Sequence, residues 1–277
     1  QDDFAKIPGS PIAYWVSDRV KEIFEKSKKL NEIASPKQGM ATADNDRFLR
    51  FWNETSYDNI GLNFLNRDAA KKSLLKWFPY NKGGGFRKWY GNQEYVVNWE
   101  NDGKEIREYV DEKGKQRSRP QNIDYYFKPS ISWSRITSSF NSFRFYPKGF
   151  IFDQAGHSIF SNDTLVNIAY LNSKFCSFIL NVMNPTMNLE VGYIQSIPAA
   201  TESFSEKTSS ILIDIAKADW DSYETSWDFT QNPIIGMNKP NLEQAFNTWQ
   251  QQNSDAVAEM KRLEEENNKL FIDAYGL

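Results

Sequence analysis

Cations and aromatic residues alternate in the middle of the sequence. Between residues 71 and 91 stand six Lys or Arg and no Asp or Glu, interleaved with the aromatic residues Trp77, Tyr80, Trp89 and Tyr90. Between residues 113 and 148 stand eight Lys or Arg against a single acid, Asp124. Clustered cations neutralise the phosphates of a nucleic-acid duplex and release its counterions, so this pattern predicts DNA binding. A solvated basic face is the alternative.

The formal net charge of -3 hides an uneven distribution of charge along the chain. Residues 36–150 carry 20 Lys or Arg against 13 Asp or Glu, whereas residues 151–277 carry seven against 17. The middle of the chain is therefore the basic part, with a balance of +7, and the end is acidic, with a balance of -10. A basic part favours a nucleic-acid partner, and an acidic end favours a protein partner.

Three consecutive glycines, Gly83 to Gly85, precede Phe86, Arg87 and Lys88. Their spacing is neither that of a P-loop nor that of a dinucleotide-binding fingerprint. Glycine lets the backbone approach a ligand closely, and the cations that follow favour an anion. The run predicts a loop that approaches a phosphate, and a flexible turn is the alternative.

Other residue types that could do chemistry are sparse. Asp111-Glu112-Lys113 has the Asp-x-Lys spacing of some nucleases, but no Pro-Asp pair precedes it. The single histidine, His157, is expected in a turn, and no nucleophile elbow accompanies it. The single cysteine, Cys176, excludes an internal disulfide and is expected to be a packed thiol on a helix. One Cys and one His cannot form the usual zinc site.

Short apolar or alternating runs between turn-forming residues predict strands. The expected strands are Leu30–Ala34, Arg47–Trp52, Tyr95–Trp99, Tyr125–Phe127, Ile131–Ile136, Phe143–Tyr146 and Phe150–Phe152, with extended segments at Pro11–Val16 and Leu189–Pro198.

Apolar residues at helical spacing predict helices between and after these strands. Ser17 caps the first helix, and Pro185 ends the one that begins at Ser173. The other expected helices are Asp68–Phe78, Asn101–Glu112, Leu165–Leu171, Ser203–Asp221 and Asn241–Ala274.

The fold class expected from these elements is α+β. A connector strand and helix (residues 1–34) leads into a β-rich domain with short helices (35–200), and a mainly helical region (201–277) follows. No apolar run reaches the roughly 18 to 20 residues of a membrane span, and a reducing cytoplasm is expected. The chain begins with Gln1 rather than Met, so a piece of a longer protein is expected.

Several strings resemble a known family. LNEIA at residues 30–34 and QGMATADNDRFLR at 38–50 resemble the opening of a target-recognition domain of type I specificity subunits. LNSKF at 171–175, Asn184-Pro185-Thr186, EVGYI at 190–194 and Ile197-Pro198 resemble its closing helix and strand. YWVS at 14–17, the 38–50 string and the ending from LEEENN at 263–268 to Tyr275-Gly276-Leu277 resemble the C-terminal part of the adenine-specific methyltransferases of BREX phage-defence systems.

The resemblance implies that catalysis and the choice of DNA sequence belong to different parts of a longer protein. An upstream domain would bind S-adenosylmethionine and methylate adenine N6, while this part would choose the sequence in double-stranded DNA. The Asn/Asp-Pro-Pro-aromatic loop that such catalysis needs is missing, because Phe78-Pro79-Tyr80 and Asn184-Pro185-Thr186 both lack the second proline. We therefore expect no catalytic residue, metal or cofactor in this chain, and S-adenosylmethionine in the parent enzyme. The upstream domain and other defence-complex subunits are the expected protein partners.

Bases are expected to be read in the major groove, where Arg pairs with guanine and Asn or Gln with adenine. The residues expected on reading loops are Arg87, Lys88, Lys115, Gln116, Arg117, Arg119, Gln121 and Asn122, with Lys82, Lys128 and Arg135 as phosphate contacts. Three further residues have two possible roles: they contact DNA, or they form a structural corner that orders the domain. They are Asn45, Arg47 and Arg50.

Two other functions compete with DNA reading. In the first, the acidic helical end docks other subunits and DNA contact is minor. In the second, the chain is an independent nuclease, which requires metal-dependent cleavage. Steep salt dependence of duplex binding would favour DNA reading over the docking module.

Overall fold

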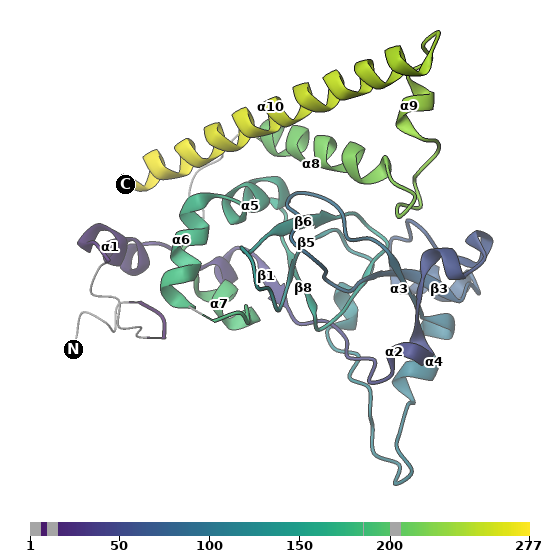
Figure 1. Ribbon diagram of the computed structural model, residues 1–277. Coiled ribbons are helices and arrows are strands. Elements are labelled where there is room, and N and C mark those ends of the chain that lie inside the picture. Colours follow the sequence, from purple (N-terminus) through teal and green to yellow (C-terminus); the bar gives the residue numbers. More distant parts are fainter. Residues whose placement is uncertain (1–6, 10–15, 185, 200–205) are drawn as a thin grey trace.

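A computed structural model describes residues 7–9, 16–184, 186–199 and 206–277. The extended segment expected at 11–16 lies outside these residues except for Val16. Within them the chain forms two four-stranded sheets and a set of helices, which confirms the α+β class (Figure 1). Among the described helices, none has both the length and the apolar character that crossing a membrane requires.

The first sheet is antiparallel throughout. Its order is β1 (Ser35–Lys37), β8 (Gly156–Phe160), β5 (Ser130–Ser134) and β6 (Phe143–Tyr146). The second sheet has the order β2 (Leu49–Phe51), β4 (Tyr95–Asn98), β3 (Trp77–Asn81) and β7 (Ile151–Phe152), in which only the β3–β7 pair is parallel.

Each sheet has its own apolar core. Phe78, Tyr80 and Trp99 are fully or almost fully buried around the second sheet. Trp133 and Phe143 of the first sheet are fully buried in a larger core. The helices that contribute to this larger core are α1 (Asp18–Lys26), α5 (Thr164–Leu171), α6 (Lys174–Met183), α7 (Val191–Ser196), α8 (Glu206–Asp221) and α10 (Leu242–Tyr275).

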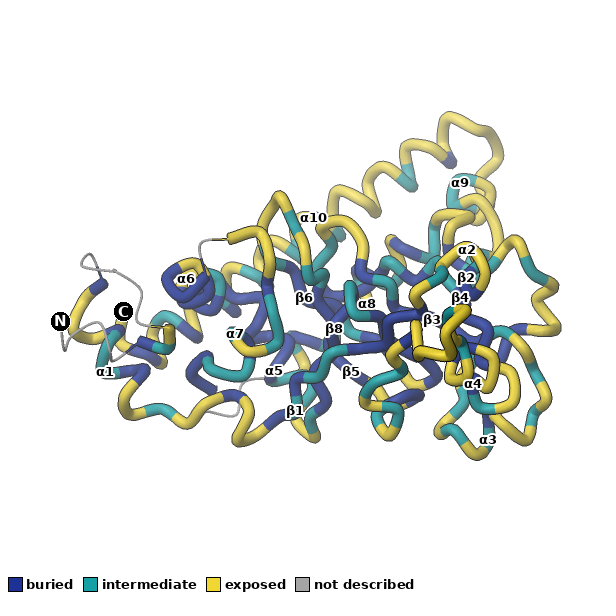
Figure 2. Tube along the Cα trace, turned by 90° about the horizontal axis from the view of Figure 1, so that it is seen from below, coloured by how far each residue is buried: buried dark blue, intermediate teal, exposed yellow. Residues whose placement is uncertain are grey.

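The long helix α10 crosses the top of the molecule in Figure 1, with α8 beneath it. Leu263, Asn267, Phe271 and Tyr275 recur every four residues and form its buried face, because such residues share one side of a helix. The beginning of α10 and the short helix α9 (Pro233–Gly236) are mostly exposed (Figure 2). Only the last third of α10 is therefore built into the core.

The structure confirms best the predicted elements that have strong periodicity. The structure has strands at β4, β5 and β6 and helices at α5, α6 and α10, within a few residues of the expected bounds. The expected strand over residues 47–52 is half correct, because a short helix, α2 (Asn45–Phe48), precedes β2. The strand expected at 150–152 is β7.

Several expected elements are wrong or too long. Leu30–Glu32 is a 3-10 turn rather than a strand, closed by a hydrogen bond from the Lys29 amide to Glu32. Residues 123–125 also form a 3-10 turn, and Phe127 has a φ of 70°. The helix expected at 68–78 is only α3 (Arg67–Lys72), because Leu74 adopts a φ of 59° and β3 follows. Residues 191–196, expected to be extended, form α7.

The helix expected at 101–112 is α4 (Glu100–Arg107). Asn101, Asp102 and Gly103 have left-handed backbone angles, and Arg107 is the last helical residue. The chain then leaves α4 as an extended loop. Strands β1 and β8, half of the first sheet, were not predicted from the sequence.

Candidate nucleic-acid interface

A hairpin of residues 108–119, here called the basic hairpin, projects from the body of the molecule (Figure 1, bottom). Val110 and Gln116 form an antiparallel bridge, and the Asp111 amide donates to the Lys115 carbonyl at 2.9 Å. Gly114 turns the chain with a φ of 76°. The Asp111 carboxylate accepts hydrogen bonds from the Lys113 and Lys115 amides, both at 2.9 Å, so it stabilises the turn.

The base of the basic hairpin is fixed to the body. Arg119 and Ala41 exchange backbone hydrogen bonds of 2.8 and 3.0 Å. The Arg117 amide donates to the Tyr109 carbonyl at 2.9 Å, and the buried Ser118 hydroxyl donates to the Ile106 carbonyl. Hydrogen bonds thus fix the base of the hairpin, and its tip projects from the body of the molecule.

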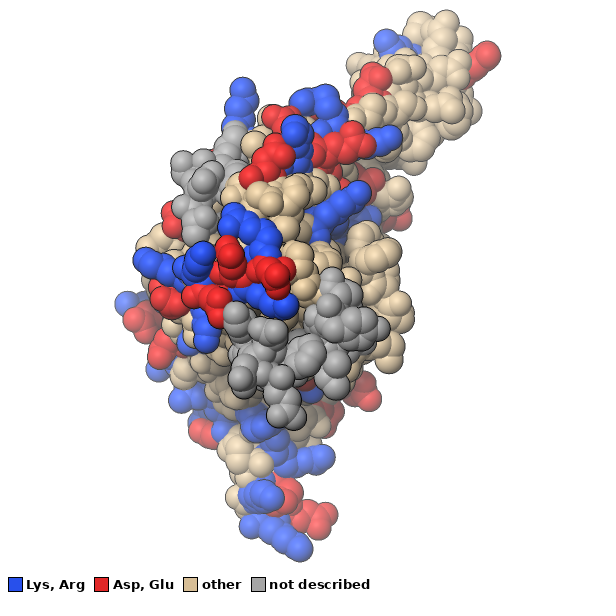
Figure 3. Space-filling model, turned by 90° about the vertical axis from the view of Figure 1, so that its left-hand side faces the viewer, with Lys and Arg blue, Asp and Glu red and all other residues tan. Residues whose placement is uncertain are grey.

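The turn and the returning strand of this hairpin carry four exposed cations. They are Lys113, Lys115, Arg117 and Arg119, and none forms an ion pair with another residue in the described part of the chain. Figure 3 shows Lys and Arg side chains gathered on the projection at the bottom of the molecule, with a smaller acidic group beside them. This projection presents four of the cations of the second basic stretch, at residues 113–119, to solvent.

Arg117 is held in a defined position. Its guanidinium lies over the ring of Tyr109, 5.1 Å from the centroid, and its Nη1 donates to the Tyr109 hydroxyl at 3.0 Å. The Tyr109 hydroxyl in turn donates to Asp44 at 3.1 Å. Ordering an exposed arginine before it binds reduces the entropy lost on binding.

The other residues in and beside the hairpin that were expected to contact DNA differ from Arg117 in their contacts. Gln116 is exposed, and its amide donates to Ser118 at 2.7 Å. Gln121 and Asn122 donate to the carbonyls of Gly39 and Gln38, at 3.5 and 2.8 Å, so they hold the preceding segment. Lys128 is exposed over the ring of Tyr125, 5.1 Å from its centroid.

The expected contacts in the first basic stretch are paired within the molecule. Lys82 forms an ion pair of 3.1 Å with the buried Asp153. Arg87 contacts Asp219 of α8 at 2.9 Å, and Lys88 contacts Glu264 of α10 at 3.1 Å. The acidic C-terminal helices therefore neutralise cations that the sequence pattern assigned to DNA.

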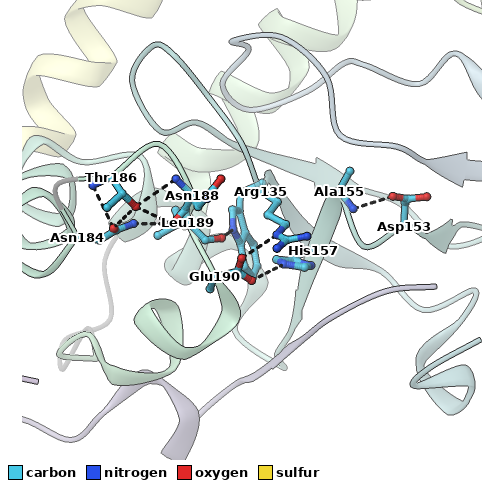
Figure 4. Close-up of polar contacts among 10 residues, drawn as sticks. Arg135, Asp153, Ala155, His157, Asn184, Thr186, Asn188, Leu189 and Glu190 are labelled. Carbon is cyan, nitrogen blue, oxygen red and sulfur yellow. Dashed lines mark hydrogen bonds and ion pairs between the residues drawn. The ribbon is translucent and has the colours of Figure 1, made fainter. Parts of the chain in front are cut away.

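Arg135 is also paired, and it belongs to a half-buried polar group around the buried His157, drawn in Figure 4. Its Nε donates to Glu190 at 2.7 Å, and the other oxygen of Glu190 lies 3.7 Å from Nε2 of His157. His157 lies in β8 rather than in the expected turn. Burial lowers the pKa of His157 to about 4, although Glu190 opposes this shift. The imidazole is therefore neutral at pH 7.

Asn45, Arg47 and Arg50 lie in a corner around α2. Asn45 accepts from the Thr42 hydroxyl at 2.7 Å, and Arg50 donates to the carbonyls of Asp46 and Leu49. Arg47 forms an ion pair of 2.8 Å with Glu105, and this hydrogen bond lowers the pKa of Glu105. These contacts favour the domain-ordering interpretation.

The remaining chemistry-bearing residues are structural. Burial raises the pKa of the Cys176 thiol, which agrees with a packed side chain. No group of three or more potential metal-ligating side chains occurs among the described residues. The Gly83–Gly85 run joins the antiparallel strands β3 and β4 and is not followed by a helix, so it does not fit the strand–loop–helix site of a nucleotide-like cofactor.

Two curated proteins match this chain along its whole length. The adenine-specific methyltransferase PglX of Lacticaseibacillus casei (strain Zhang) is 41% identical over 289 residues, and BrxX of Escherichia coli O9:H4 (strain HS) is 36% identical over 282 residues. The chain is homologous to the C-terminal part of these methyltransferases. This confirms the expected BREX-type resemblance. The chain spans 24% of PglX and 22% of BrxX.

No protein-family model matches the chain. Among solved structures, the Type IIL restriction-modification enzyme MmeI in complex with DNA is similar over 88% of this chain and 33% of the MmeI chain. The TM-score is 0.45 and the sequence identity is 12%.

Tyr109, Asp219 and Glu264 are site residues that sequence reasoning missed. Tyr109 lies eight residues from Arg117, but only the bend of the hairpin brings the two together. Asp219 and Glu264 lie more than 130 residues from their basic partners. No local signal in the sequence links these pairs.

Proposed function

We propose that this chain reads double-stranded DNA for an S-adenosylmethionine-dependent adenine-N6 methyltransferase. The observation that carries the proposal is its identity of 41% with PglX over the whole chain, since PglX is named an adenine-specific methyltransferase. Methyl transfer and cofactor binding would lie in the larger part of the protein outside the matched segment. This chain would supply binding and site choice.

The basic hairpin is the proposed reading element. Arg117, held by Tyr109, would enter the major groove and pair with guanine, because a guanidinium matches its O6 and N7 acceptors. Lys113, Lys115 and Arg119 would contact phosphates and set the orientation of the hairpin. Lys128 is a further exposed cation for the backbone.

A salt titration tests the proposal. The chain is titrated with a fluorescent duplex at 50 and 200 mM salt. With four hairpin cations on phosphates or bases, we expect log affinity to fall with log salt concentration at a slope of roughly -3 to -4. Replacing Lys113 and Lys115 by Gln reduces the slope by roughly two, whereas the exposed Lys261→Gln leaves it unchanged. Absence of duplex binding at 50 mM salt contradicts the proposal.

A second function is supported by exposed apolar residues at the beginning of α10 and in α9. Ile235 is 72% exposed and Leu242 74%, and exposed apolar residues that lie together are typical of protein contacts. In this alternative the helical end docks another subunit of a defence complex. Duplex binding that is absent at low salt, together with retained subunit binding, would favour it.

A further inference from the structure

The carboxylate of Asp44 joins two parts of the molecule that are far apart in the sequence. Asp44 lies directly before α2, and its Oδ1 accepts from the Arg47 amide at 3.1 Å, which caps this helix. Its other oxygen, Oδ2, accepts from the hydroxyl of Tyr109 in the basic hairpin, also at 3.1 Å. One half-buried carboxylate therefore fixes both the start of α2 and the side chain of Tyr109.

The backbone before Asp44 holds this carboxylate in place. Ala43 has a φ of 64°, in the left-handed region that residues other than glycine rarely adopt. Such angles persist where the surrounding contacts determine them, and they are frequent at functional sites. Ala41 exchanges backbone hydrogen bonds with Arg119 at the base of the hairpin. The segment 41–44 is thus bonded to the basic hairpin by its backbone at one end and by the Asp44 side chain at the other.

Tyr109 also contacts two side chains of α2. The guanidinium of Arg47 lies over the Tyr109 ring, 5.1 Å from its centroid, and forms an ion pair with Glu105 at 2.8 Å. The ring of Phe48 meets that of Tyr109 edge-on, with the centroids 5.2 Å apart. The position of the Tyr109 ring is therefore set by α2 as well as by the hairpin that carries it.

The contacts of Tyr109 determine which edge of the Arg117 guanidinium is available. The Tyr109 hydroxyl gives its proton to Asp44, so it accepts from Arg117, which donates through Nη1 at 3.0 Å. Nε and Nη2 of Arg117 donate to no acceptor within the described part of the chain. These two nitrogens form one edge of the planar guanidinium, and their parallel N–H groups match the O6 and N7 acceptors of guanine.

Stability alone does not account for this arrangement. Asp44 and Tyr109 are half-buried and Arg117 is exposed. Polar contacts near a surface contribute little to the free energy of unfolding, because water competes for the same groups. Their main effect is to reduce the number of conformations that Arg117 adopts before it binds, and hence the entropy that it loses on binding.

We propose that Asp44 is a positioning residue for base recognition, which acts through the Tyr109 hydroxyl to present the Nε–Nη2 edge of Arg117 to guanine in the major groove. Asp44 itself does not contact DNA. The inference rests on the proposed function, because it states how the basic hairpin would read a base. It also gives the corner around α2 a role in recognition.

Selection by the chain from duplexes with a randomised centre tests the proposal, because it measures base preference separately from affinity. We expect the unchanged chain to prefer guanine at one position by roughly tenfold or more. Tyr109→Phe keeps the aromatic ring and removes the hydroxyl. Asp44→Ser keeps a side-chain cap for α2 and removes the oxygen that accepts from Tyr109. Both variants should reduce this preference to about threefold or less, with the salt dependence unchanged because no cation is lost.

Three further variants make the result specific. Arg117→Lys identifies the position concerned, because it keeps the charge and removes the paired donors of the guanidinium. Tyr223→Phe and Asp163→Ser are matched controls on exposed residues outside the hairpin and α2, and they should keep the full guanine preference.

A guanine preference that is lost in Arg117→Lys but retained in Tyr109→Phe and Asp44→Ser overturns the positioning role and leaves the proposed function intact. A uniform loss of affinity in these two variants, with the base preference unchanged, overturns it as well. If the unchanged chain binds no duplex at low salt, or if Arg117→Lys keeps every base preference, the proposed reading by Arg117 fails and the inference fails with it.

Discussion

At the residue scale, the environment of each cation decides what that cation can do. Arg117 and Arg87 are both arginines in basic stretches beside aromatic residues. Arg117 rests on Tyr109 with its outer face exposed, whereas Arg87 is neutralised by Asp219 and stacks on Trp220 at 5.0 Å. The first has no acidic partner among the described residues, and the second holds α8 against the loop. The amino-acid composition around Arg117 and Arg87 does not distinguish these two environments.

His157 makes the stability of the fold depend on pH. The pKa of its imidazole is lowered from 6.5 to about 4 in the folded chain, mainly by burial. Between these values the unfolded chain binds a proton that the folded chain does not, so stability is lost as the pH falls from about 6.5 to 4. A pKa shift of this size lowers the free energy of unfolding by roughly 3 kcal/mol.

Urea unfolding of the unchanged chain and of His157→Gln at pH 7, 5.5 and 4.5 measures this effect. We expect the free energy of unfolding to fall more steeply for the unchanged chain, because Gln does not titrate. Carboxylates that do not interact with residue 157 are present in both proteins and cancel in the comparison. Parallel pH profiles would contradict the buried, neutral imidazole.

At the element scale, local periodicity identified the elements that pack on one face. Helices α5, α6 and α10 repeat apolar residues at helical spacing, and strands β4 to β6 are short apolar runs. The pattern failed where single residues adopt left-handed angles, as Leu74 does after α3 and Asn101 does in α4. Leu rarely adopts such an angle, so no local signal marks the end of α3 at Leu74, whereas Asn101-Asp102-Gly103 is a sequence in which left-handed angles are common.

The two halves of α10 are expected to differ in their contribution to stability. Phe271 is fully buried against Tyr170, whereas Phe246 on the exposed part of the helix is 42% exposed. Phe271→Ala should lower the free energy of unfolding by about 3 to 5 kcal/mol, because it leaves a cavity in the larger core. Phe246→Ala should lower it by less than about 1 kcal/mol. Denaturant unfolding checks both values, and equal losses would contradict the arrangement of α10.

At the scale of the whole molecule, the basic middle and the acidic end are parts of one structure. Lys88 and Glu264 are 176 residues apart and form an ion pair, and Trp89 donates to the same carboxylate at 2.7 Å. The charge balance along the sequence correctly indicated a basic middle, but it could not indicate which cations the acidic helices neutralise. The cations of the basic hairpin and the buried Arg144 remain without acidic partners among the described residues.

The homologous segment is about a quarter of PglX, so the proposed reading role is best tested with this chain as part of a full-length adenine-specific methyltransferase. The central measurement is a genome-wide map of N6-methyladenine in cells that carry the enzyme unchanged, with Arg117→Ala, or with Lys261→Ala on the exposed face of α10. We predict that Arg117→Ala weakens site binding by about 1 to 3 kcal/mol and changes or abolishes the methylated sequence, whereas Lys261→Ala changes neither. An identical methylation pattern and duplex affinity in all three would contradict a reading role for the basic hairpin.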